Sequence, residues 1–562
     1  MELNGAELVV KALRAEGVEV IFGVIGSSIL DLADAIARTP GLRLIATQTE
    51  QAAAYMADGY ARVTGKPGVC CATVGPGATN LLGGVAQAFL ESAPVIALVG
   101  EVHTKHYGKG ASNFHEIEQS LVFKPVTKWS VRIERTDRIP ELMARAFRVA
   151  TTGRKGPVYI GLPRDVQKNR IPEPSFIPPE QSRPSGVVRG DAGQIRRAAR
   201  LLIDAAGPVI LVGGGVRWAG ARDHVLELAE LASIPVAMTH KGLVPEDHPL
   251  VAGIVQTSGS PVAAEVVRGA DVILALGCTF SQVATGSYGH TIIPDKGKII
   301  HVDIDPEEIG KNYPVELGIV GDAGAVIEDL LEEIRTIGPN RTAERLERLE
   351  TFSRLKARWE AEQEREMASD RIPITRLRLQ GDLRKVLRRD ALVACESGAT
   401  HGWMYYGFPC YEPILEPGEY SIMGSALCMA MAAKVADPDR QVVSVTGDGA
   451  FMMVCQELAT AVANRIHVVV VVPHNDIYGN MYNKQHIHFG DRFTGTQLHV
   501  PNLAEVARAF GAHGERVERP AELIPAYRRA LECGKPAVVD VIIGREFSEL
   551  EAPTKLRVED RY

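Results

Sequence analysis

The chain has 562 residues, of which 46% are hydrophobic and 23% are charged, and its formal net charge is −7. At roughly 150 residues per domain, this length predicts three or four domains of ordinary globular composition. The mildly acidic charge argues against a nucleic-acid surface, and the apolar stretches are too short to span a membrane, so we expect neither partner.

The cysteine pattern and the N-terminal residues both favour the cytoplasm as the compartment of the protein. None of the eight cysteines has the spacing C-x-x-C, and several lie in apolar runs such as residues 69–72. These features are typical of buried, reduced thiols. The first residues lack the basic and apolar segments of a signal peptide. We therefore expect a cytoplasmic protein without a zinc site.

Residues 1–170 alternate short apolar strands with helices. Strands are expected at residues 18–22, 42–46, 69–74 and 94–99. Strands that alternate with helices of this length predict parallel βαβ units. The Pro-rich stretch from Pro172 to Pro184 then predicts an exposed linker and a domain boundary.

Two further α/β domains are expected, at residues 187–336 and 373–550. Between them, the charged segment 337–372 has apolar residues at helical spacing and predicts a helical linker. We expect residues 551–562 to form a C-terminal tail. The strands of the two domains are expected at residues 208–212, 272–276, 299–304, 392–395, 442–446, 467–472 and 537–543. The predicted fold class is α/β, with three doubly wound parallel-sheet domains in series.

The most informative stretch is Gly447-Asp448-Gly449-Ala450, which follows a predicted strand and opens a helix. In an open α/β sheet, ligands collect beyond the carboxyl ends of the strands. A helix N-terminus offers free N–H groups and a partial positive charge, which suits a phosphate. The glycines allow close approach of the backbone, and Asp448 supplies an anionic oxygen for a hard cation.

A second polar stretch, His474-Asn475-Asp476-Ile477, begins after the intervening residues 450–473. It follows the next predicted strand and is therefore expected at the same sheet edge. Asn475 supplies an amide oxygen, and a backbone carbonyl two residues further on supplies a third ligand. Mg²⁺ prefers octahedral oxygen ligands from protein, phosphates and water, so the two stretches together predict a magnesium site.

At this point the chain resembles the thiamine diphosphate-dependent enzymes, whose signature is Gly-Asp-Gly, about twenty-five residues, then Asn-Asn. His474 stands at the first Asn, and Asn475 stands at the second, which is the family's metal ligand. The resemblance implies thiamine diphosphate and Mg²⁺ as cofactors, with Asp448, Asn475 and the carbonyl of Ile477 as metal ligands. It also implies cofactor contacts from Gly447, Gly449, Ala450, Tyr478, Gly479 and Asn480.

Glu50 begins a small-residue helix that continues into Asp58-Gly59-Tyr60-Ala61-Arg62, a series that resembles the pyrimidine-binding domain of the same family. The resemblance implies that Glu50 is catalytic. It would hydrogen-bond the far pyrimidine nitrogen and favour the imino tautomer, which takes the thiazolium C2 proton at close range. Without that context, a glutamate at a helix start could equally be a favourable dipole charge. Thr49 stands where the family often has His.

Other segments match the family's cofactor contacts. Residues Gly75, Pro76, Gly77 and Asn80 lie in a matching loop, although each glycine alone could equally mark an ordinary turn. Met423 aligns with the large apolar residue that holds the cofactor in its bent form, although a core methionine is the alternative. Gly398 and Thr400 fall where the family binds the diphosphate.

Glu50 and Asp448 belong to different predicted domains. In the family these positions meet across a subunit interface, one from each chain. The resemblance therefore implies a homodimer with active sites at the interface, and we expect a homotetramer that acts on a small carbonyl substrate.

The domain order matches the acetolactate synthase, pyruvate oxidase and decarboxylase group. Residues 114–119 and 127–129 look most like acetolactate synthase-like proteins, whereas residues 26–28 and 489–493 lean toward sulfoacetaldehyde acetyltransferase. We expect a lyase or carboligase that acts on a 2-oxo acid or related acyl donor and passes the acyl group to an acceptor. The alternatives are a sulfoacetaldehyde acetyltransferase-like enzyme, an acyl-CoA lyase or decarboxylase, and a non-catalytic cofactor-binding homologue.

Substrate selectivity and the middle domain are less sharply defined. In relatives the middle fold holds FAD, ADP or nothing. Here, with Gly213-Gly214-Gly215 and residues 303–306, we favour an unoccupied structural domain. Side chains proposed to contact substrate, each of which could equally serve packing, are Ile25, Ser27, His115, Gln119, Met481, Tyr482, Gln485 and His486.

Overall fold

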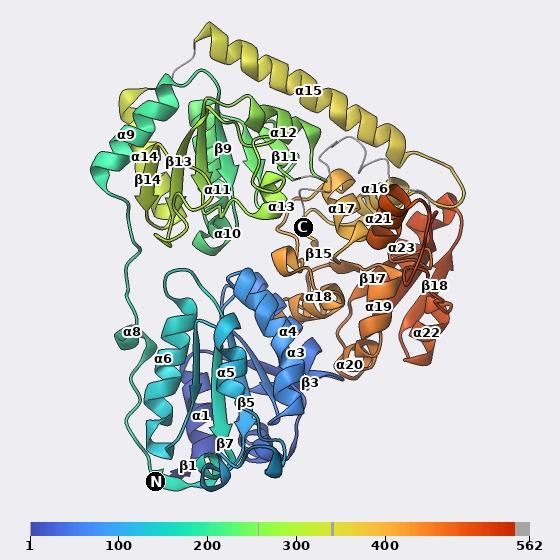
Figure 1. The fold of residues 1–562 in the computed structure, drawn as a ribbon. Coiled ribbons are helices and arrows are strands. Elements are labelled where there is room, and N and C mark those ends of the chain that lie inside the picture. Colours follow the sequence, from blue (N-terminus) through green and yellow to red (C-terminus); the bar gives the residue numbers. More distant parts are fainter. Residues whose placement is uncertain (1, 257, 339–341, 546–562) are drawn as a thin grey trace.

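The computed structural model describes residues 2–256, 258–338 and 342–545, in which three α/β domains follow one another (Figure 1). Each domain contains one sheet of parallel strands, with five or six strands. This arrangement confirms the predicted fold class. No helix in the described ranges is both long and apolar enough to cross a membrane.

The N-terminal sheet has the strand order β3-β2-β4-β5-β7-β6. Its strands are β2 (Val20–Gly23), β3 (Arg43–Ala46), β4 (Gly68–Ala72), β5 (Val95–Glu101), β6 (Trp129–Arg132) and β7 (Val158–Pro163). The helices are α1 (Gly5–Ala15), α2 (Leu30–Ala37), α3 (Glu50–Thr64), α4 (Pro76–Leu90), α5 (Gln119–Phe123), α6 (Ile139–Thr151) and α7 (Arg164–Lys168). A small antiparallel pair, β1 (Glu2–Asn4) with β8 (Arg170–Pro172), joins the two ends of this domain.

The middle sheet has the order β11-β10-β9-β12-β13-β14 and follows an extended segment that carries α8 (Pro179–Ser182). Its strands are β9 (Pro208–Val212), β10 (Val236–Met238), β11 (Val251–Ile254), β12 (Val272–Leu276), β13 (Lys298–Asp303) and β14 (Leu317–Val320). Its helices are α9 (Ala192–Asp204), α10 (Gly215–Ala219), α11 (Arg222–Ala232), α12 (Pro261–Arg268), α13 (Gln282–Thr285) and α14 (Ala323–Ile337). The long helix α15 (Ala343–Met367) then runs along the outside toward the C-terminal domain (Figure 1).

The C-terminal sheet has the order β15-β16-β17-β19-β18. Its strands are β15 (Leu392–Cys395), β16 (Val442–Val445), β17 (Val469–His474), β18 (His513–Val517) and β19 (Ala537–Ile542). Its helices are α16 (Arg376–Val386), α17 (Ala399–Gly407), α18 (Ser425–Ala436), α19 (Asp448–Val454), α20 (Glu457–Ala463), α21 (Gly479–Phe489), α22 (Leu503–Ala509) and α23 (Leu523–Glu532).

Both faces of these sheets are covered, as the near-continuous apolar strands predict. In β5, Ile96 and Leu98 enter one hydrophobic core, whereas Val95, Ala97 and Val99 enter the core on the opposite face. Alternate side chains of a strand point to opposite faces, so a strand buried on both sides must be apolar at every position.

The strand β17 differs from its expected bounds of 467–472. It runs from Val469 to His474 because it pairs with β19 along its whole length, as far as the partners His474 and Ile542. His474 is therefore the last residue of a buried strand, whereas the sequence placed it in the loop after the strand.

The N- and C-terminal domains meet where α3 packs against α18, two helices rich in alanine. A Cβ atom on Gly59 would lie 2.7 Å from the Cα of Met429 and 3.0 Å from its carbonyl oxygen. Only glycine leaves room for backbones to approach this closely, so Gly59 sets the spacing between the two domains.

We predict that Gly59→Ala destabilises the protein, although alanine favours a helix by about 1 kcal/mol over glycine. The added methyl group overlaps the α18 backbone, and overpacking costs about 1–3 kcal/mol. Thermal unfolding would show a lower midpoint. The control is Gly269→Ala, where the nearest atom to an added Cβ is 3.4 Å away. An unchanged or raised midpoint for Gly59→Ala would contradict the close-packing argument.

Candidate functional site

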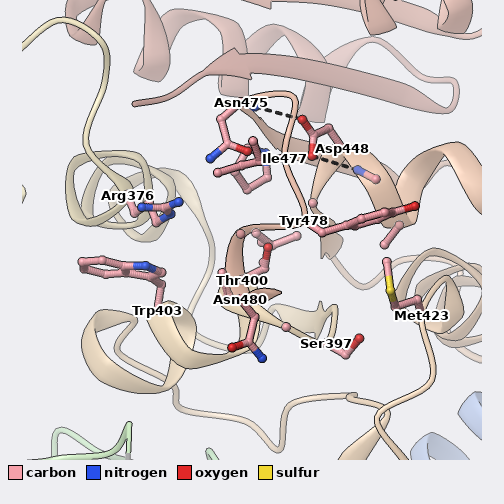
Figure 2. A pocket seen from close by; sticks show the side chains of 18 of the residues that line it. Arg376, Ser397, Thr400, Trp403, Met423, Asp448, Asn475, Ile477, Tyr478 and Asn480 are labelled. Atoms are coloured by element: carbon pink, nitrogen blue, oxygen red, sulfur yellow. Dashed lines mark hydrogen bonds between the residues drawn. The ribbon is translucent and has the colours of Figure 1, made fainter. Parts of the chain in front are cut away.

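A cavity of about 440 Å³ lies beyond the carboxyl ends of β15, β16 and β17, and we call it the cofactor cavity (Figure 2). The helices α17, α19 and α21 each begin at its wall, so three sets of helix N-terminal N–H groups converge there. The lining includes thirteen residues singled out from the sequence: Gly398, Thr400, Met423, Gly447, Asp448, Gly449, Ala450, Asn475, Ile477, Tyr478, Gly479, Asn480 and Met481.

Asp448 lies buried at the end of this cavity and ties two loops together. Its Oδ2 accepts hydrogen bonds from the backbone N–H groups of Asn475 at 2.9 Å and Asp476 at 2.7 Å. Its Oδ1 accepts one from the N–H of Gly449 at 2.8 Å. Burial raises the pKa of Asp448, and these hydrogen bonds offset only part of that effect. A cation beside the carboxylate would favour its charged form.

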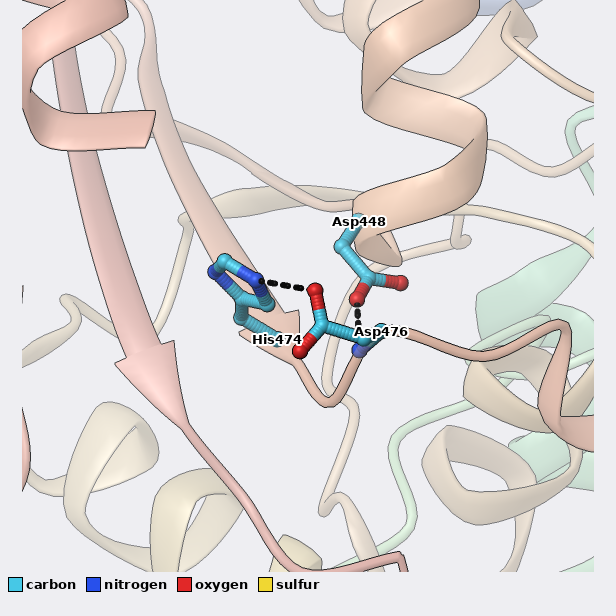
Figure 3. Close-up of side chains that lie close together, drawn as sticks. All are labelled: Asp448, His474 and Asp476. Carbon is cyan, nitrogen blue, oxygen red and sulfur yellow. Dashed lines mark hydrogen bonds and ion pairs between the residues drawn. The ribbon is translucent and has the colours of Figure 1, made fainter. Parts of the chain in front are cut away.

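Two donor sets are available around Asp448. In Figure 3, Asp448, His474 and Asp476 lie together, with one potential ligand atom from each within 4.8 Å of the others. However, His474 places Nδ1 2.7 Å from Asp540 and Nε2 3.3 Å from Asp476, so both ring nitrogens are engaged. The carboxylate of Asp448 with oxygens of Asn475 and Ile477 is therefore the better fit, and it is a hard set that suits Mg²⁺.

His474 has a supporting position next to this set. Burial alone would lower the pKa of His474, but the hydrogen bonds to Asp540 and Asp476, together with the charges of Asp540 and Asp448, outweigh burial and raise it. The imidazole of His474 lies between Asp540 and Asp476 and holds the strand end against the loop that carries Asn475. The departure from Asn at this position thus provides contacts to two carboxylates.

Glu50 is placed by the N-terminal domain at the start of α3, where Thr49 caps the helix. Its Oε2 accepts a hydrogen bond from Asn80 Nδ2 at 3.0 Å. A Cβ on Gly77 would lie 3.2 Å from Glu50 Oε1, so glycine lets α4 start close to this carboxylate. Glu50, Gly77 and Asn80 therefore form one cluster.

The neighbouring loop is organised by Gln119. Gly75, at φ +71°, donates its N–H to Gln119 Oε1 at 2.5 Å, and Gln119 Nε2 donates to Gly100 O and Tyr159 Oη. A Cβ on Gly75 would lie 2.6 Å from the carbonyl of His115. Gln119 is buried and its amide is fully used, so it shapes the Gly75 loop.

Within one chain the two groups of predicted residues remain separate. Among the described residues, those that line the cofactor cavity all lie between positions 376 and 543. The N-terminal residues that do not line it are Ile25, Ser27, Glu50, Gly75, Pro76, Gly77, Asn80, His115 and Gln119.

Three predicted substrate residues on α21 contact the segment that follows the helix. Tyr482 stacks on Phe493 with centroids 4.0 Å apart. Gln485 hydrogen-bonds the backbone of Thr494, and His486 Nδ1 lies 2.5 Å from Asp491. None of the three is among the residues that line the cofactor cavity, whereas Met481 is.

The sequence did not single out the cavity wall formed by Arg376 and Trp403. In Figure 2 these side chains lie one over the other, across the cavity from Met423, with the guanidinium 5.3 Å from the ring. Trp403 lies three residues after the predicted Thr400 and so on the same face of α17, a spacing that could have identified it. Arg376 follows no motif.

A second cavity, of about 140 Å³, lies where the middle domain faces the N-terminal domain and includes Gly214, Gly215 and Asp303. Arg154 and Lys155 of the N-terminal domain contribute to its wall. The cavity is small beside the roughly 300–1,000 Å³ of typical cofactor pockets.

Comparison with known proteins identifies the class to which this fold and site belong. The chain matches the thiamine pyrophosphate enzyme N-terminal TPP binding domain over residues 3–121, the central domain over 195–330 and the C-terminal TPP binding domain over 396–541. The chain therefore belongs to the thiamine pyrophosphate enzymes, and the predicted family is confirmed.

Within that family the chain is similar over nearly its full length to acetolactate synthase large subunits. It is 39% identical to a probable acetolactate synthase large subunit of Methanocaldococcus jannaschii, covering 96% of this chain and 92% of that protein. It is 34% identical to the acetolactate synthase large subunit of Corynebacterium glutamicum, with 97% and 87% covered. It is 33% identical to the acetolactate synthase isozyme 3 large subunit of Escherichia coli, covering 99% of this chain and 97% of that protein.

The buried carboxyl of Glu396, just before the cavity residue Ser397, generates a pH prediction. Burial raises its pKa from the ordinary 4.5 to about 7, against hydrogen bonds from the N–H groups of Ser397 and Ala426. An unfolded glutamate ionises near pH 4.5 while the folded one stays protonated to about pH 7. Stability from this group therefore falls as the pH rises through that window.

We expect the free energy of unfolding of Glu396→Gln to rise, relative to that of the wild type, by about 2–3 kcal/mol between pH 5 and pH 8. The glutamine loses one acceptor at every pH, but it does not ionise. The difference between the two melting temperatures at each pH would report this. A difference that does not change with pH would contradict the raised pKa.

Proposed function

We propose that the protein is a thiamine diphosphate- and Mg²⁺-dependent enzyme, acetolactate synthase-like, that transfers an acyl group from a 2-oxo acid or related donor to an acceptor carbonyl. The observation that carries this proposal is the cofactor cavity, where three helix N-termini and one buried carboxylate converge. The acetolactate synthase large subunits that the chain matches over nearly its full length support the same reaction class.

The residues of the cavity fit the cofactor's charged end. Asp448, Asn475 and the Ile477 carbonyl would hold Mg²⁺, and the N–H groups at the starts of α17, α19 and α21 would face the diphosphate. Met423 would support the bent form of the cofactor from the opposite wall. When bound, the cofactor supplies a carbon nucleophile and an electron sink for the substrate carbonyl.

Glu50 would hold a proton at the cofactor's pyrimidine nitrogen, with Asn80 fixing the orientation of its carboxylate at 3.0 Å. Of the N-terminal residues that the structure describes, none lines the cofactor cavity of one chain. We therefore propose that Glu50 of a second copy of the chain faces the cavity, in a homodimer and further in a homotetramer.

We propose that the middle domain is structural and that the protein is cytoplasmic. The 140 Å³ cavity of the middle domain is small for FAD or ADP, which supports the first point. All eight cysteines are unpaired and six are buried, which is typical of a reducing compartment.

We predict that Glu50→Gln lowers kcat by about 10²–10⁴-fold while the cofactor still binds, because an amide at this position does not hold the proton. Carbon dioxide release from 2-oxo acids measures turnover, and calorimetry measures binding. Glu141→Gln, an exposed glutamate of the same domain paired with Arg138, is the control. Turnover within twofold of the wild type would overturn the assigned role.

We predict that Asp448→Ala weakens Mg²⁺-dependent binding of thiamine diphosphate at least about tenfold, since it removes the anionic ligand. Calorimetric titrations with and without Mg²⁺ measure the effect. The exposed Asp439→Ala variant should titrate like the wild type. If Asp448→Ala retained the full metal dependence, the metal would lie elsewhere.

A further inference from the structure

A third cavity, of about 200 Å³, lies between the middle and C-terminal domains, and we call it the histidine cavity. It shares five wall residues with the cofactor cavity: Gly398, Ala399, Trp403, Ser421 and Asn480. His240 contributes from the middle domain and His401 from α17. A small molecule in the histidine cavity would therefore lie beside a cofactor in the first.

The two histidines flank one buried carboxylate. Glu416, 1% exposed, accepts hydrogen bonds from His240 Nδ1 at 3.0 Å and from His401 Nε2 at 2.7 Å. The hydroxyl of Tyr405 donates to the same carboxylate. A carboxylate with three donors holds both imidazoles in fixed orientations.

The charges of this cluster favour an ionised Glu416 and a proton on His240. Burial alone would raise the pKa of Glu416, but the hydrogen bonds and charges of His240 and His401 outweigh burial and hold the pKa well below its ordinary value. Burial alone would lower the pKa of His240, but Glu416 and Glu91 outweigh it and raise the pKa, against the charge of Arg217. An ionised Glu416 thus faces a readily protonated His240.

Each histidine has a nitrogen left for a ligand. Both side chains are 22% exposed, and both line the histidine cavity. In the described part of the chain, His240 Nε2 and His401 Nδ1 have no hydrogen-bond partner. The other carboxylate at this wall is Glu419, whose pKa burial raises and whose oxygen accepts a hydrogen bond from Ser281.

We propose that the histidine cavity binds the carboxylate of a small oxo acid through the imidazolium forms of His240 and His401. Each ring then donates one N–H to Glu416, which positions it, and the other N–H to the acid. The proposal rests on the proposed function, since it places the acid's carbonyl toward the cofactor cavity. Hydrogen bonds to a charged group contribute about 1.5–3 kcal/mol each. The volume is below that of a typical drug-sized pocket, which favours a small acid.

The test compares oxamate with oxamide, an uncharged molecule of nearly the same shape that replaces the carboxylate by an amide. Neither releases carbon dioxide, so binding can be measured in the cofactor-loaded protein by calorimetry or ligand-observed NMR. We expect oxamate to bind at least about tenfold more tightly than oxamide, because only oxamate carries the charge. Equal affinities would overturn the proposal.

Two variants keep the contact with Glu416 and remove the second nitrogen. The amide of glutamine in His401→Gln takes the place of Nε2, and the amide of asparagine in His240→Asn takes the place of Nδ1. Each variant should weaken the binding of oxamate about tenfold or more and leave the affinity for oxamide unchanged. The control His513→Gln removes a histidine paired with Glu515, at 2.7 Å, outside the three cavities described above. Oxamate affinity that is unchanged in both variants would also overturn the proposal.

The two levels of inference fail in different ways. If the wild type bound no thiamine diphosphate, the proposed function would be wrong, whereas charge-independent oxamate binding in a cofactor-loaded protein would refute only the subsite. The wild-type comparison needs no substitution, so it decides the question even where a variant does not fold.

Discussion

The architecture of the site depends on one buried carboxylate. Asp448 accepts hydrogen bonds from backbone N–H groups of its own helix and of the loop after β17. It therefore fixes two neighbouring strand ends relative to each other. Leaving such a group without partners would be costly in a buried position, which makes the loop geometry obligatory. The same contacts direct the starts of α19 and α21 at one cavity. A cation site and a phosphate site therefore arise from a single local arrangement.

Much of this arrangement could be predicted from sequence because it is local along the chain. Gly447 to Ala450 and Asn475 to Ile477 each follow an apolar strand, and the carboxyl ends of parallel strands share an edge. The cavity wall formed by Arg376 and Trp403 could not be predicted as a pair, since the two residues come together only through the packing of α16 on α17. The ends of strands were also hard to predict from sequence. The strand β17 extends to His474 because it pairs with β19 that far.

Contacts that form only in the folded chain are a second limit. Tyr482, Gln485 and His486, which are predicted to contact substrate, also contact the segment that follows α21, and their spacing in the sequence does not indicate these contacts. Conversely, the cluster around Glu416 combines positions 240, 401 and 416 from two domains. No spacing marks such a cluster, because it exists only once the domains are packed. Chemistry built within one βαβ unit is visible in sequence, and chemistry built between domains is not.

The close contact at Gly59 also bears on how activity would vary with dilution. With α3 pressed backbone to backbone against α18, the N- and C-terminal domains of one chain have little freedom to rotate and bring Glu50 into their own cavity. Under the proposed function, a complete site then exists only in an assembled pair of chains. Specific activity would decline once the protein concentration fell below the dissociation constant of that pair, and added cofactor would oppose the decline by binding only the assembled state.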